Sequence, residues 1–348
     1  MLTRLSSPAH EELYRVEDRG CGLRGYIALH STRLGPAAGG LRMRLYEDDD
    51  AAIEDVLKLS RGMSYKNAAA GLPLGGGKAV IMGDPSRDKT PARLRAMGHA
   101  IDSLAGRYWT AEDMGMSPDD MAEIARETRF VAGRDQGAHA SGDPSPVTAR
   151  GVMGAMQAGA MRVWGKADLT GRRVAVQGLG HVGWHLCLLL HEAGAQLQVA
   201  DTDAARIAST VKEFGAEPVA PEVIHAAPAD IFAPCAIGGV LTARSVAEIK
   251  APMICGAANN QLATPEVAQA LEARGILYLP DYVASGGGII NVAAEILQIA
   301  DRDGWVADRL SAMQANMAHI LTRAGAEGVS PAVIADRMVE EQLLARAV

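Results

Sequence analysis

The stretch Arg173-Val-Ala-Val-Gln-Gly-Leu-Gly-His-Val-Gly183 decides how the second half of the chain folds. Its first five residues predict a β-strand, and the Gly-x-Gly-x-x-Gly pattern that follows is typical of the turn that opens a helix in dinucleotide-binding folds. Gly178 and Gly180 allow a tight turn and a close approach of the backbone to a pyrophosphate, and Gly183 allows close helix–strand packing. The helix N-terminus, beginning with His181-Val182, offers N–H groups to the phosphates.

The next strand supplies a second element of the same pattern. Gln196–Ala200 is an apolar run that ends at Asp201, about 20 residues beyond the glycine turn, where such folds place an acidic residue. A carboxylate there accepts hydrogen bonds from the ribose hydroxyls and repels the extra phosphate of NADP. We therefore predict NAD as the cofactor. The alternative is a glycine turn with a purely structural role.

Three residues of this turn superficially suggest a metal site. His181 and His185 are four residues apart, and Cys187 follows. No glutamate stands between the histidines as in zinc-protease helices, and a bound zinc ion would crowd the pyrophosphate loop. We predict no metal site.

Further apolar runs predict a parallel sheet in this half of the chain. They lie around Ile231-Phe232, at Pro252–Cys255 and at Ile276–Leu279, each separated by enough residues for a helix or a crossover. Gly142-Asp-Pro-Ser-Pro146 combines turn formers with a helix cap, and is the best candidate boundary. We predict a Rossmann domain over 142–330, and residues 331–348 as a helix that can pack back on the first domain.

The first half of the chain also predicts an α/β domain, over 1–141. An amphipathic helix follows Asp50 and ends near Gly71, and Thr90-Pro91 begins another that Gly106 stops. Arg107–Ala111 is a predicted strand, and Ser117-Pro118 opens a further helix, so we expect strands and helices to alternate through this part of the chain. The predicted fold class is therefore α/β with two domains, an N-terminal substrate domain and a C-terminal Rossmann domain, separated by a cleft.

Gly71-Leu-Pro-Leu-Gly-Gly-Gly-Lys-Ala-Val80 resembles a phosphate-binding loop but does not fit that motif. Leu72 occupies the position of the leading glycine, and Ala79 has no hydroxyl to hold magnesium. The residues after the lysine, Ala79–Met82, predict a strand rather than a helix. Lys78 therefore needs another role.

Lys78 and Lys66 both lie among small and apolar residues, whereas lysine usually lies on the solvated surface. Asp113 follows a predicted strand, where α/β sheets place reactive groups. Two cations and a carboxylate beside an NAD domain indicate a small anionic substrate that undergoes proton and hydride transfer. Surface ammonium groups without a role are the alternative.

At this point the sequence resembles the leucine/phenylalanine/valine dehydrogenase family, relatives of glutamate dehydrogenase. The resemblance extends from residue 34 to residue 296. It is carried by the motifs LGPAAGGLRM, GMSYKNAAAGLPLGGGKAVI, TAEDMG, DPSPVTARGV, GLGHVG, DIFAPCA, CGAANNQL, DYVASGGGIINV and NVAAEI.

The resemblance implies roles for residues at the matching positions. Lys66 corresponds to the lysine that binds the substrate carboxylate, and Lys78 and Asp113 correspond to the catalytic lysine and aspartate. A lysine in a poorly solvated site can act as a base near neutral pH. The remaining positions are Gly39 and Gly40 lining the substrate site, Thr148 and Asn260 at the nicotinamide and the reacting centre, and Ala233, Pro234, Cys235 and Ala236 bordering the cofactor.

The implied side-chain pocket is apolar, formed by Ala38, Met63, Ala111, Ile289 and Val292. A charged glutamate side chain would lack a partner there. Ala38 replaces a larger residue of leucine-specific relatives, which would open room for an aromatic side chain. We expect NAD-dependent reversible oxidative deamination of a hydrophobic L-amino acid, of leucine, valine, isoleucine or phenylalanine type, to the 2-oxo acid and ammonia. The alternatives are a tryptophan- or glutamate-preferring relative, or a non-catalytic NAD-binding module.

The bulk properties fit a cytoplasmic enzyme. The 348 residues are 48% hydrophobic and 22% charged, with a net charge of −7, which argues against a nucleic-acid or anionic-membrane partner. The N-terminal residues predict no secretory signal, and no apolar run is long enough to span a bilayer. The four scattered cysteines predict buried, reduced thiols. The resemblance implies a homo-oligomer, a dimer or larger.

Overall fold

A computed structural model describes residues 2–137 and 139–345, and the chain divides into two compact units. The N-terminal unit contains the chain up to Pro144, Ile289–Val306 and the residues from Val339 onward. The C-terminal unit contains Ser145–Gly288 and Ala307–Met338. Each unit therefore combines segments that are far apart in the sequence. The domain limits 1–141 and 142–330 stay a prediction.

The N-terminal unit is built on a seven-stranded mixed sheet in the order β1-β2-β3-β6-β4-β7, with β5 also paired to β6. β1, β2, β3 and β6 are antiparallel neighbours, whereas β4 and β5 run parallel to β6. The strands are β1 Leu2–Leu5, β2 Glu12–Asp18, β3 Leu23–Ser31, β4 Ala37–Ala38, β5 Leu41–Arg44, β6 Gly75–Met82 and β7 Tyr108–Trp109. The predicted regular alternation of strands and helices is wrong for this unit, because five strands precede its first helix.

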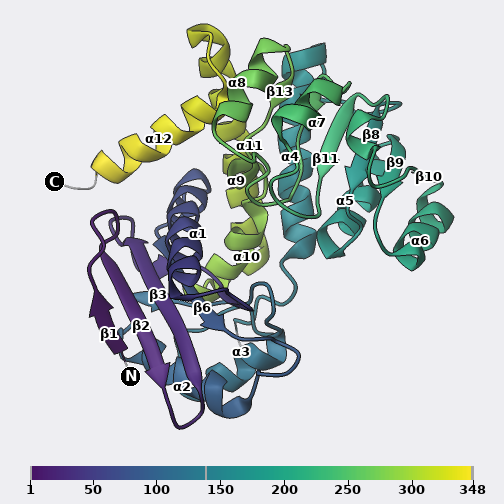
Figure 1. The fold of residues 1–348 in the computed structure, drawn as a ribbon. Coiled ribbons are helices and arrows are strands. Elements are labelled where there is room, and N and C mark those ends of the chain that lie inside the picture. Colours follow the sequence, from purple (N-terminus) through teal and green to yellow (C-terminus); the bar gives the residue numbers. More distant parts are fainter. Residues whose placement is uncertain (1, 138, 346–348) are drawn as a thin grey trace. The chain divides into compact units, whose positions relative to one another are not determined.

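Helices cover both faces of this sheet because its strands alternate apolar residues between two cores. Tyr26 and Ala28 pack with Val56 of α1, which runs along β3 and β6 (Figure 1). Ile27 and Leu29 face the other way and pack with residues of α2 and α3. These helices are α1 Asp49–Ala69, α2 Pro91–Asp102 and α3 Pro118–Ile124.

The capping residues decide where these helices begin. Thr90 and Ser117 accept hydrogen bonds from backbone N–H groups of α2 and α3, as predicted. Asp48 caps α1, two positions before the predicted start at Asp50, because its side chain reaches the N–H of Ala51. α2 ends at Asp102, before the predicted stop at Gly106.

β6 is longer than predicted and includes the lysine. The predicted strand Ala79–Met82 is the second half of β6, whose first half is the glycine run Gly75–Gly77 followed by Lys78. A side chain on Gly76 would place its Cβ 2.1 Å from the backbone nitrogen of Ser64 in α1. The glycines therefore let the helix lie directly on the strand.

The C-terminal unit contains a six-stranded sheet in the order β10-β9-β8-β11-β12-β13, in which every pair is parallel. This is the strand order of a Rossmann fold, as predicted. The strands are β8 Arg173–Gln177, β9 Gln196–Ala200, β10 Glu217–Pro218, β11 Ile231–Pro234, β12 Met253–Ile254 and β13 Leu277–Tyr278. The short strand β10 has no counterpart among the predicted strands.

The remaining helices connect these strands or close the chain. They are α4 Ser145–Trp164, α5 His181–Glu192, α6 Ala204–Phe214, the 3-10 helix η1 Ile224–Ala226, α7 Ala243–Glu248, α8 Glu266–Ala273, α9 Asp281–Ala284, α10 Gly287–Ile296, α11 Arg302–Glu327 and α12 Pro331–Ala345. Within residues 2–137 and 139–345, no helix has both the length and the apolar character that crossing a bilayer requires.

The cysteines are all free thiols, but not all are buried. Cys187 and Cys255 are buried, as predicted, whereas Cys21 and Cys235 are half-buried. The prediction is wrong for these two because each lies outside the core, in a turn or just after a strand end.

Candidate active site

Lys78, Asp113 and Arg42 form a charged cluster inside the N-terminal unit. Lys78 Nζ lies 3.0 Å and Arg42 Nε 2.8 Å from the same oxygen of Asp113, Oδ2. The Lys78 side chain is 6% exposed and that of Asp113 is 24% exposed. Lys78 and Asp113 were predicted catalytic residues, and the structure brings them into direct contact.

Strand register places these groups on one side of the sheet. Arg42 of β5 pairs with Val80 of β6, so its side chain shares a face with Val80 and with Lys78 two residues earlier. Leu41 bridges to Glu112 in parallel, which puts Asp113 beside Arg42. The cluster is therefore assembled from strand neighbours that are distant in the sequence.

The two cations keep Asp113 ionised. Burial by itself raises the pKa of this carboxyl group, but the charges of Lys78 and Arg42 and their hydrogen bonds outweigh it and lower the pKa to about 2. Asp113 is therefore an anion at neutral pH, and its carboxylate can accept a proton or a hydrogen bond.

Arg42 also reaches a second carboxylate, on α1. Its Nη1 lies 3.2 Å from Oδ2 of Asp55, and the hydroxyl of Tyr46 donates to the same oxygen at 2.8 Å. Sequence reasoning missed Arg42, Asp55 and Tyr46. The signal available was the position of Arg42 within the Leu34–Met43 motif.

Gly39 and Gly40 hold the backbone close to these groups. A Cβ on Gly40 would lie 2.8 Å from the Cβ of Asp113, and a Cβ on Gly39 would lie 2.8 Å from the Cγ of Met63. Only glycine fits at either position without displacing its neighbours. The structure thus places Gly40 against Asp113 of the charged cluster, and Met63 against the neighbouring Gly39.

Lys66 lies in the last turn of α1, three residues after Met63 and therefore on the same side of the helix. The neighbouring Asn67 is buried and donates hydrogen bonds to the carbonyls of Gly75 and Ala38. These bonds fix the end of α1 to β6 and β4, and so fix the backbone that carries Lys66.

The predicted pocket residues all belong to the N-terminal unit. Ala38 and Ala111 are buried, and they lie in β4 and immediately after β7. Ile289 and Val292 are buried in α10, in the part of that helix assigned to the same unit. All four are apolar residues in buried positions, and the pocket itself stays a prediction.

A buried carboxylate on α10 anchors the segment between α3 and α4. Glu295 is 3% exposed and accepts hydrogen bonds from Gly133 N (2.8 Å), Arg134 Nε (2.8 Å) and the hydroxyl of Ser141 (2.8 Å). A Cβ on Gly133 would lie 3.8 Å from that of Ala111. Glu295 therefore connects the helix carrying Ile289 and Val292 to the loop beside Ala111, a connection that sequence reasoning missed.

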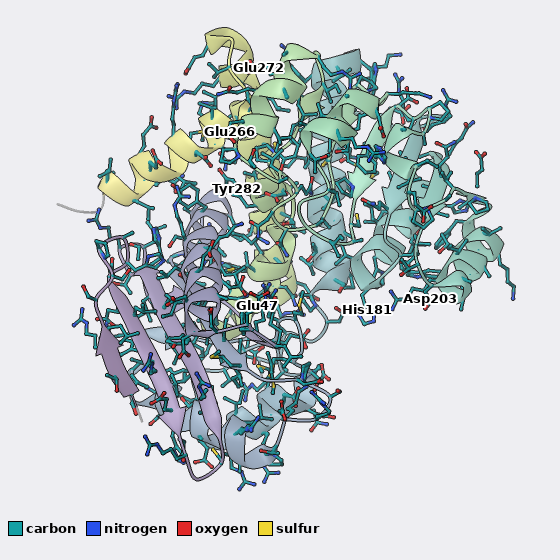
Figure 2. The ribbon with its side chains drawn as sticks, viewed as in Figure 1. Glu47, His181, Asp203, Glu266, Glu272 and Tyr282 are labelled. Carbon is teal, nitrogen blue, oxygen red and sulfur yellow. The ribbon has the colours of Figure 1, made fainter. Side chains whose placement is uncertain are left out.

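The glycine turn of the C-terminal unit has the close contacts that a dinucleotide site requires. Gly178 has a left-handed backbone (φ 98°), and a Cβ on Gly183 would lie 1.9 Å from the Gly178 carbonyl oxygen. Gly180 is the N-cap of α5 and has no side chain to cover the helix N–H groups, and His181 and Val182 follow it. Figure 2 labels His181 and Asp203 near the starts of α5 and α6.

Asp201 lies at the end of β9, next to this turn. Its Oδ2 accepts a hydrogen bond from Leu179 N at 2.6 Å, and its Oδ1 accepts one from Asp203 N at 2.9 Å. Burial raises the pKa of Asp201, but these backbone N–H groups outweigh it and lower the pKa overall. The carboxylate is thus charged and held against the glycine turn.

The other predicted cofactor residues also lie in the C-terminal unit. Ala233 and Pro234 are in β11, beside β8, and a Cβ on Gly178 would meet Ala236 at 2.7 Å. Cys235 N donates to the carbonyl of Gln177. Thr148 is in the first turn of α4, and Asn260 has a left-handed backbone (φ 52°) in the loop after β12.

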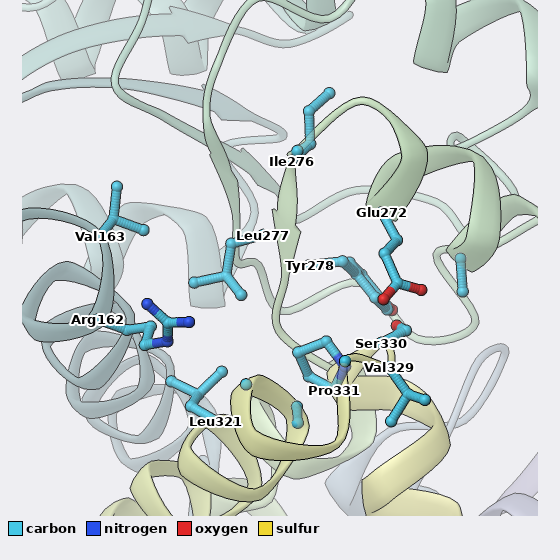
Figure 3. Close-up of a pocket in the computed structure, with 15 residues that line it drawn as sticks. Arg162, Val163, Glu272, Ile276, Leu277, Tyr278, Leu321, Val329, Ser330 and Pro331 are labelled. Atoms are coloured by element: carbon cyan, nitrogen blue, oxygen red, sulfur yellow. The ribbon is translucent and has the colours of Figure 1, made fainter.

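A separate pocket of about 430 Å³ lies in the C-terminal unit (Figure 3). Its walls come from the end of α4, from α8 and β13, and from the α11–α12 turn, and include Arg162, Glu272, Tyr278 and Leu321. It contains none of the sequence-predicted site residues. The candidate site of the N-terminal unit is the charged cluster, and that of the C-terminal unit is the glycine turn.

Two family models match the chain. The model described as "Glu/Leu/Phe/Val dehydrogenase, dimerisation domain" matches residues 10–130, which include the charged cluster. The model "Glutamate/Leucine/Phenylalanine/Valine dehydrogenase" matches residues 197–338.

Individual proteins are similar over nearly the whole chain. The chain is 45% identical over 338 residues to leucine dehydrogenase of Thermoactinomyces intermedius, covering 96% of this chain and 91% of that protein. It is 46% identical over 337 residues to valine dehydrogenase of Streptomyces virginiae, covering 96% and 94%. The crystal structure of L-tryptophan dehydrogenase from Nostoc punctiforme has a TM-score of 0.83 and 38% identity, covering 98% of this chain and 97% of that one.

Proposed function

This chain belongs to the Glu/Leu/Phe/Val dehydrogenase family, and from that premise we propose that it catalyses the NAD-dependent, reversible oxidative deamination of a hydrophobic L-amino acid. The products are the 2-oxo acid, ammonia and NADH. The single observation that carries the proposal is the contact of Lys78 and Arg42 with one carboxylate oxygen of Asp113, next to the glycine pair Gly39-Gly40.

The reaction requires a neutral substrate amine, so that its lone pair can support the departure of hydride from Cα. Lys78 is placed in this proposal as the base that takes a proton from the water that adds to the iminium carbon, and that returns this proton to the nitrogen when ammonia leaves the carbinolamine. Asp113, held as an anion, accepts the hydrogen bond of the amine and of the carbinolamine. Lys66, at the end of α1, binds the substrate carboxylate.

The glycine turn fits a dinucleotide. Gly183 allows α5 to pack closely on the preceding strand, and no side chain caps the start of α5. The backbone N–H groups there can therefore bind a pyrophosphate. The nicotinamide ring, when bound, accepts the hydride. Thr148, Asn260 and the segment Ala233–Ala236 would border it.

Asp201 supports NAD over NADP. Its pKa is lowered, so it carries a charge at neutral pH, and that charge favours ribose hydroxyls and repels a 2′-phosphate. The family comparisons fix a nicotinamide dinucleotide as the cofactor of this enzyme class, and the choice between the two forms rests on this carboxylate.

The substrate side chain should be apolar. The predicted pocket residues Ala38, Ala111, Ile289 and Val292 are all buried. A substrate carboxylate among them would lose its hydration without gaining a hydrogen-bond partner, which costs free energy. Substrates of leucine, valine or isoleucine type, or phenylalanine, therefore fit better than glutamate.

We also propose that the enzyme is a homo-oligomer of the cytoplasm. The model matched by residues 10–130 is described as a dimerisation domain, and the four cysteines are free thiols, as is usual for cytoplasmic proteins. Light scattering after size-exclusion chromatography tests the oligomeric state, and a monomer at micromolar concentration would contradict it.

The direct test is NADH formation with a panel of L-amino acids at alkaline pH. Leucine, valine, isoleucine, phenylalanine, tryptophan and glutamate are compared, each with NAD and with NADP. We expect a preference for an aliphatic or aromatic substrate and for NAD. Tight binding of NADH without reduction of NAD by any amino acid would instead identify a non-catalytic NAD-binding module.

A further inference from the structure

We propose that Arg42 is a positioning residue of the active site, which holds the Asp113 carboxylate in one orientation beside Lys78 and supplies the second fixed positive charge there. This inference rests on the proposed function, in which Lys78 and Asp113 act on the substrate. It adds a residue that neither the motifs nor the family resemblance singled out.

Arg42 connects two carboxylates through different nitrogens. Nε lies 2.8 Å from Oδ2 of Asp113, and Nη1 lies 3.2 Å from Oδ2 of Asp55. Because the guanidinium group is planar and rigid, fixing Nη1 on Asp55 also fixes the direction of the Nε–H bond. Asp55 therefore orients Arg42, and Arg42 in turn orients Asp113.

Asp55 is itself restrained from two sides. It projects from α1, whose first turns pack on the face of the sheet that bears Lys78, and it accepts a hydrogen bond from the Tyr46 hydroxyl at 2.8 Å. The Arg42 side chain is 15% exposed and that of Asp55 is 20% exposed. Pairs that are largely removed from water hold their geometry better than exposed ones.

Lys78 and Arg42 contact the same oxygen of Asp113, and this determines which oxygen can accept a hydrogen bond from a substrate. Oδ2 is occupied by both Lys78 and Arg42, whereas Oδ1 has no hydrogen-bond partner in the part of the chain that the structure describes. The carboxylate keeps 24% of its surface exposed. With its Oδ2 edge fixed, Asp113 directs Oδ1 to a substrate amine or to water.

The charge of Arg42 also acts on proton transfer. Asp113 is faced by Lys78 from β6, by Arg42 from β5 and by Tyr108 from β7, and Arg42 is faced by Asp113, Asp55 and Tyr46. Removing a positive charge makes the proton on Lys78 harder to lose and the Asp113 carboxylate easier to protonate. Both effects move the acid limb of the pH–rate profile in the same direction, to higher pH.

The test compares Arg42→Gln with Arg42→Lys. For Arg42→Gln we expect kcat to fall about 10- to 100-fold and the acid limb of kcat/KM to move up by about one pH unit. Arg42→Lys retains the positive charge but cannot bind Asp113 and Asp55 through two fixed nitrogens. We therefore expect kcat to fall while the acid limb of kcat/KM stays at the wild-type pH. Arg24→Gln is the matched control, because Arg24 makes a comparable pair with Asp49 of α1, 3.0 Å apart and exposed, and should leave both quantities unchanged.

An acid limb of Arg42→Gln at the wild-type pH would overturn the proposal, since a purely structural defect lowers the amount of folded enzyme without moving the limb. If Arg42→Gln does not fold, Asp55→Asn tests the proposal instead, because this variant keeps the positive charge of Arg42 and removes the carboxylate that orients it. A reduced kcat with no upward movement of the limb supports the proposal, and a wild-type kcat contradicts it.

A measurement without turnover separates this inference from the proposed function. Carbon-13 NMR of the aspartate carboxyl groups, with Asp113→Asn to assign the signal, follows the protonation of Asp113 directly. In Arg42→Gln this signal should titrate at higher pH than in the wild type even if no amino acid is oxidised. Identical titration in the two proteins would contradict the role of Arg42, whereas an inactive wild type would contradict only the proposed function.

Discussion

Glu295 accepts hydrogen bonds from both the backbone N–H and the hydroxyl of Ser141, at 3.1 and 2.8 Å, across 154 residues of sequence. The same carboxylate binds Gly133 and Arg134, so one buried side chain of α10 is bonded to three residues of the segment between α3 and α4. Asn291, one turn earlier, donates to the Ser141 carbonyl at 2.9 Å. The helix that bears Ile289 and Val292 is thereby bonded to a segment whose Gly133 lies next to Ala111.

We expect Glu295→Gln to destabilise the protein by about 2–4 kcal/mol. The substitution preserves size but removes the charge and turns an N–H₂ group toward donors, which leaves buried partners unsatisfied. Denaturant unfolding measures the change. Glu327→Gln is the control, because Glu327 makes ion pairs with Arg323 and Arg337 at the surface, where solvent screens them, and this substitution should change stability much less. Equal effects of the two substitutions would contradict the anchoring role.

Lys78→Ala should lower kcat by about 10²- to 10⁴-fold, because it removes the proposed base. The affinity for NADH, measured by its fluorescence, should be largely retained, since the glycine turn lies in the other unit. Lys58→Ala, at an exposed position of α1, controls for the loss of a lysine. Wild-type turnover of Lys78→Ala would remove Lys78 from the mechanism.

Asp201→Asn should weaken the discrimination against NADP. The variant keeps an acceptor for the ribose but loses the charge that repels a 2′-phosphate, so the ratio of kcat/KM for NAD to that for NADP should fall about tenfold or more. Asp203→Asn is a close control, since asparagine can still cap α6. An unchanged ratio in Asp201→Asn would show that another group selects the cofactor.

Two histidines make stability depend on pH. His30 Nδ1 lies 2.8 Å from the Ser64 hydroxyl, and its ring contacts that of His10 edge to face. Burial, together with the charges of His10 and Arg61, lowers the pKa of His30 to about 4, despite an opposing contribution from Glu11.

Because the folded pKa lies below the ordinary value of about 6.5, the unfolded chain binds the proton more readily. The contribution of His30 is complete above pH 6.5 and declines as the pH falls toward 4. Between pH 7.5 and 4.5, we expect the free energy of unfolding of the wild type to fall by up to about 2 kcal/mol more than that of His30→Asn. Urea unfolding at the two pH values measures this difference. Parallel curves for the two proteins would contradict the assignment.

Much of the C-terminal unit is predictable from the sequence because its signals are local. A strand, a glycine turn, a helix and an acidic residue follow one another within about 30 residues, and each is favoured by the residues at its own position. The same is true of the helix caps at Thr90 and Ser117. The predictions of the glycine turn, of the parallel sheet and of these caps are accordingly confirmed.

The N-terminal sheet was less predictable because its pairing is not local. β6 follows α1 but pairs with β3, β4 and β5, which all precede α1, and a run of three glycines has no strand propensity of its own. Its strand conformation comes from its neighbours, which supply the hydrogen bonds on both sides. The predicted alternation of helices and strands therefore missed β1 to β5.

The sequence by itself determined which residues could carry the chemistry, since Lys66, Lys78, Asp113 and the glycine turn are recognisable by type and spacing. Only the tertiary structure decided which partners those residues have. Strand register brings Arg42 to Asp113, the packing of α1 brings Asp55 to Arg42, and α10 brings Glu295 to Ser141. Such contacts depend on how distant segments pair and pack, and a local pattern of residues does not specify that choice.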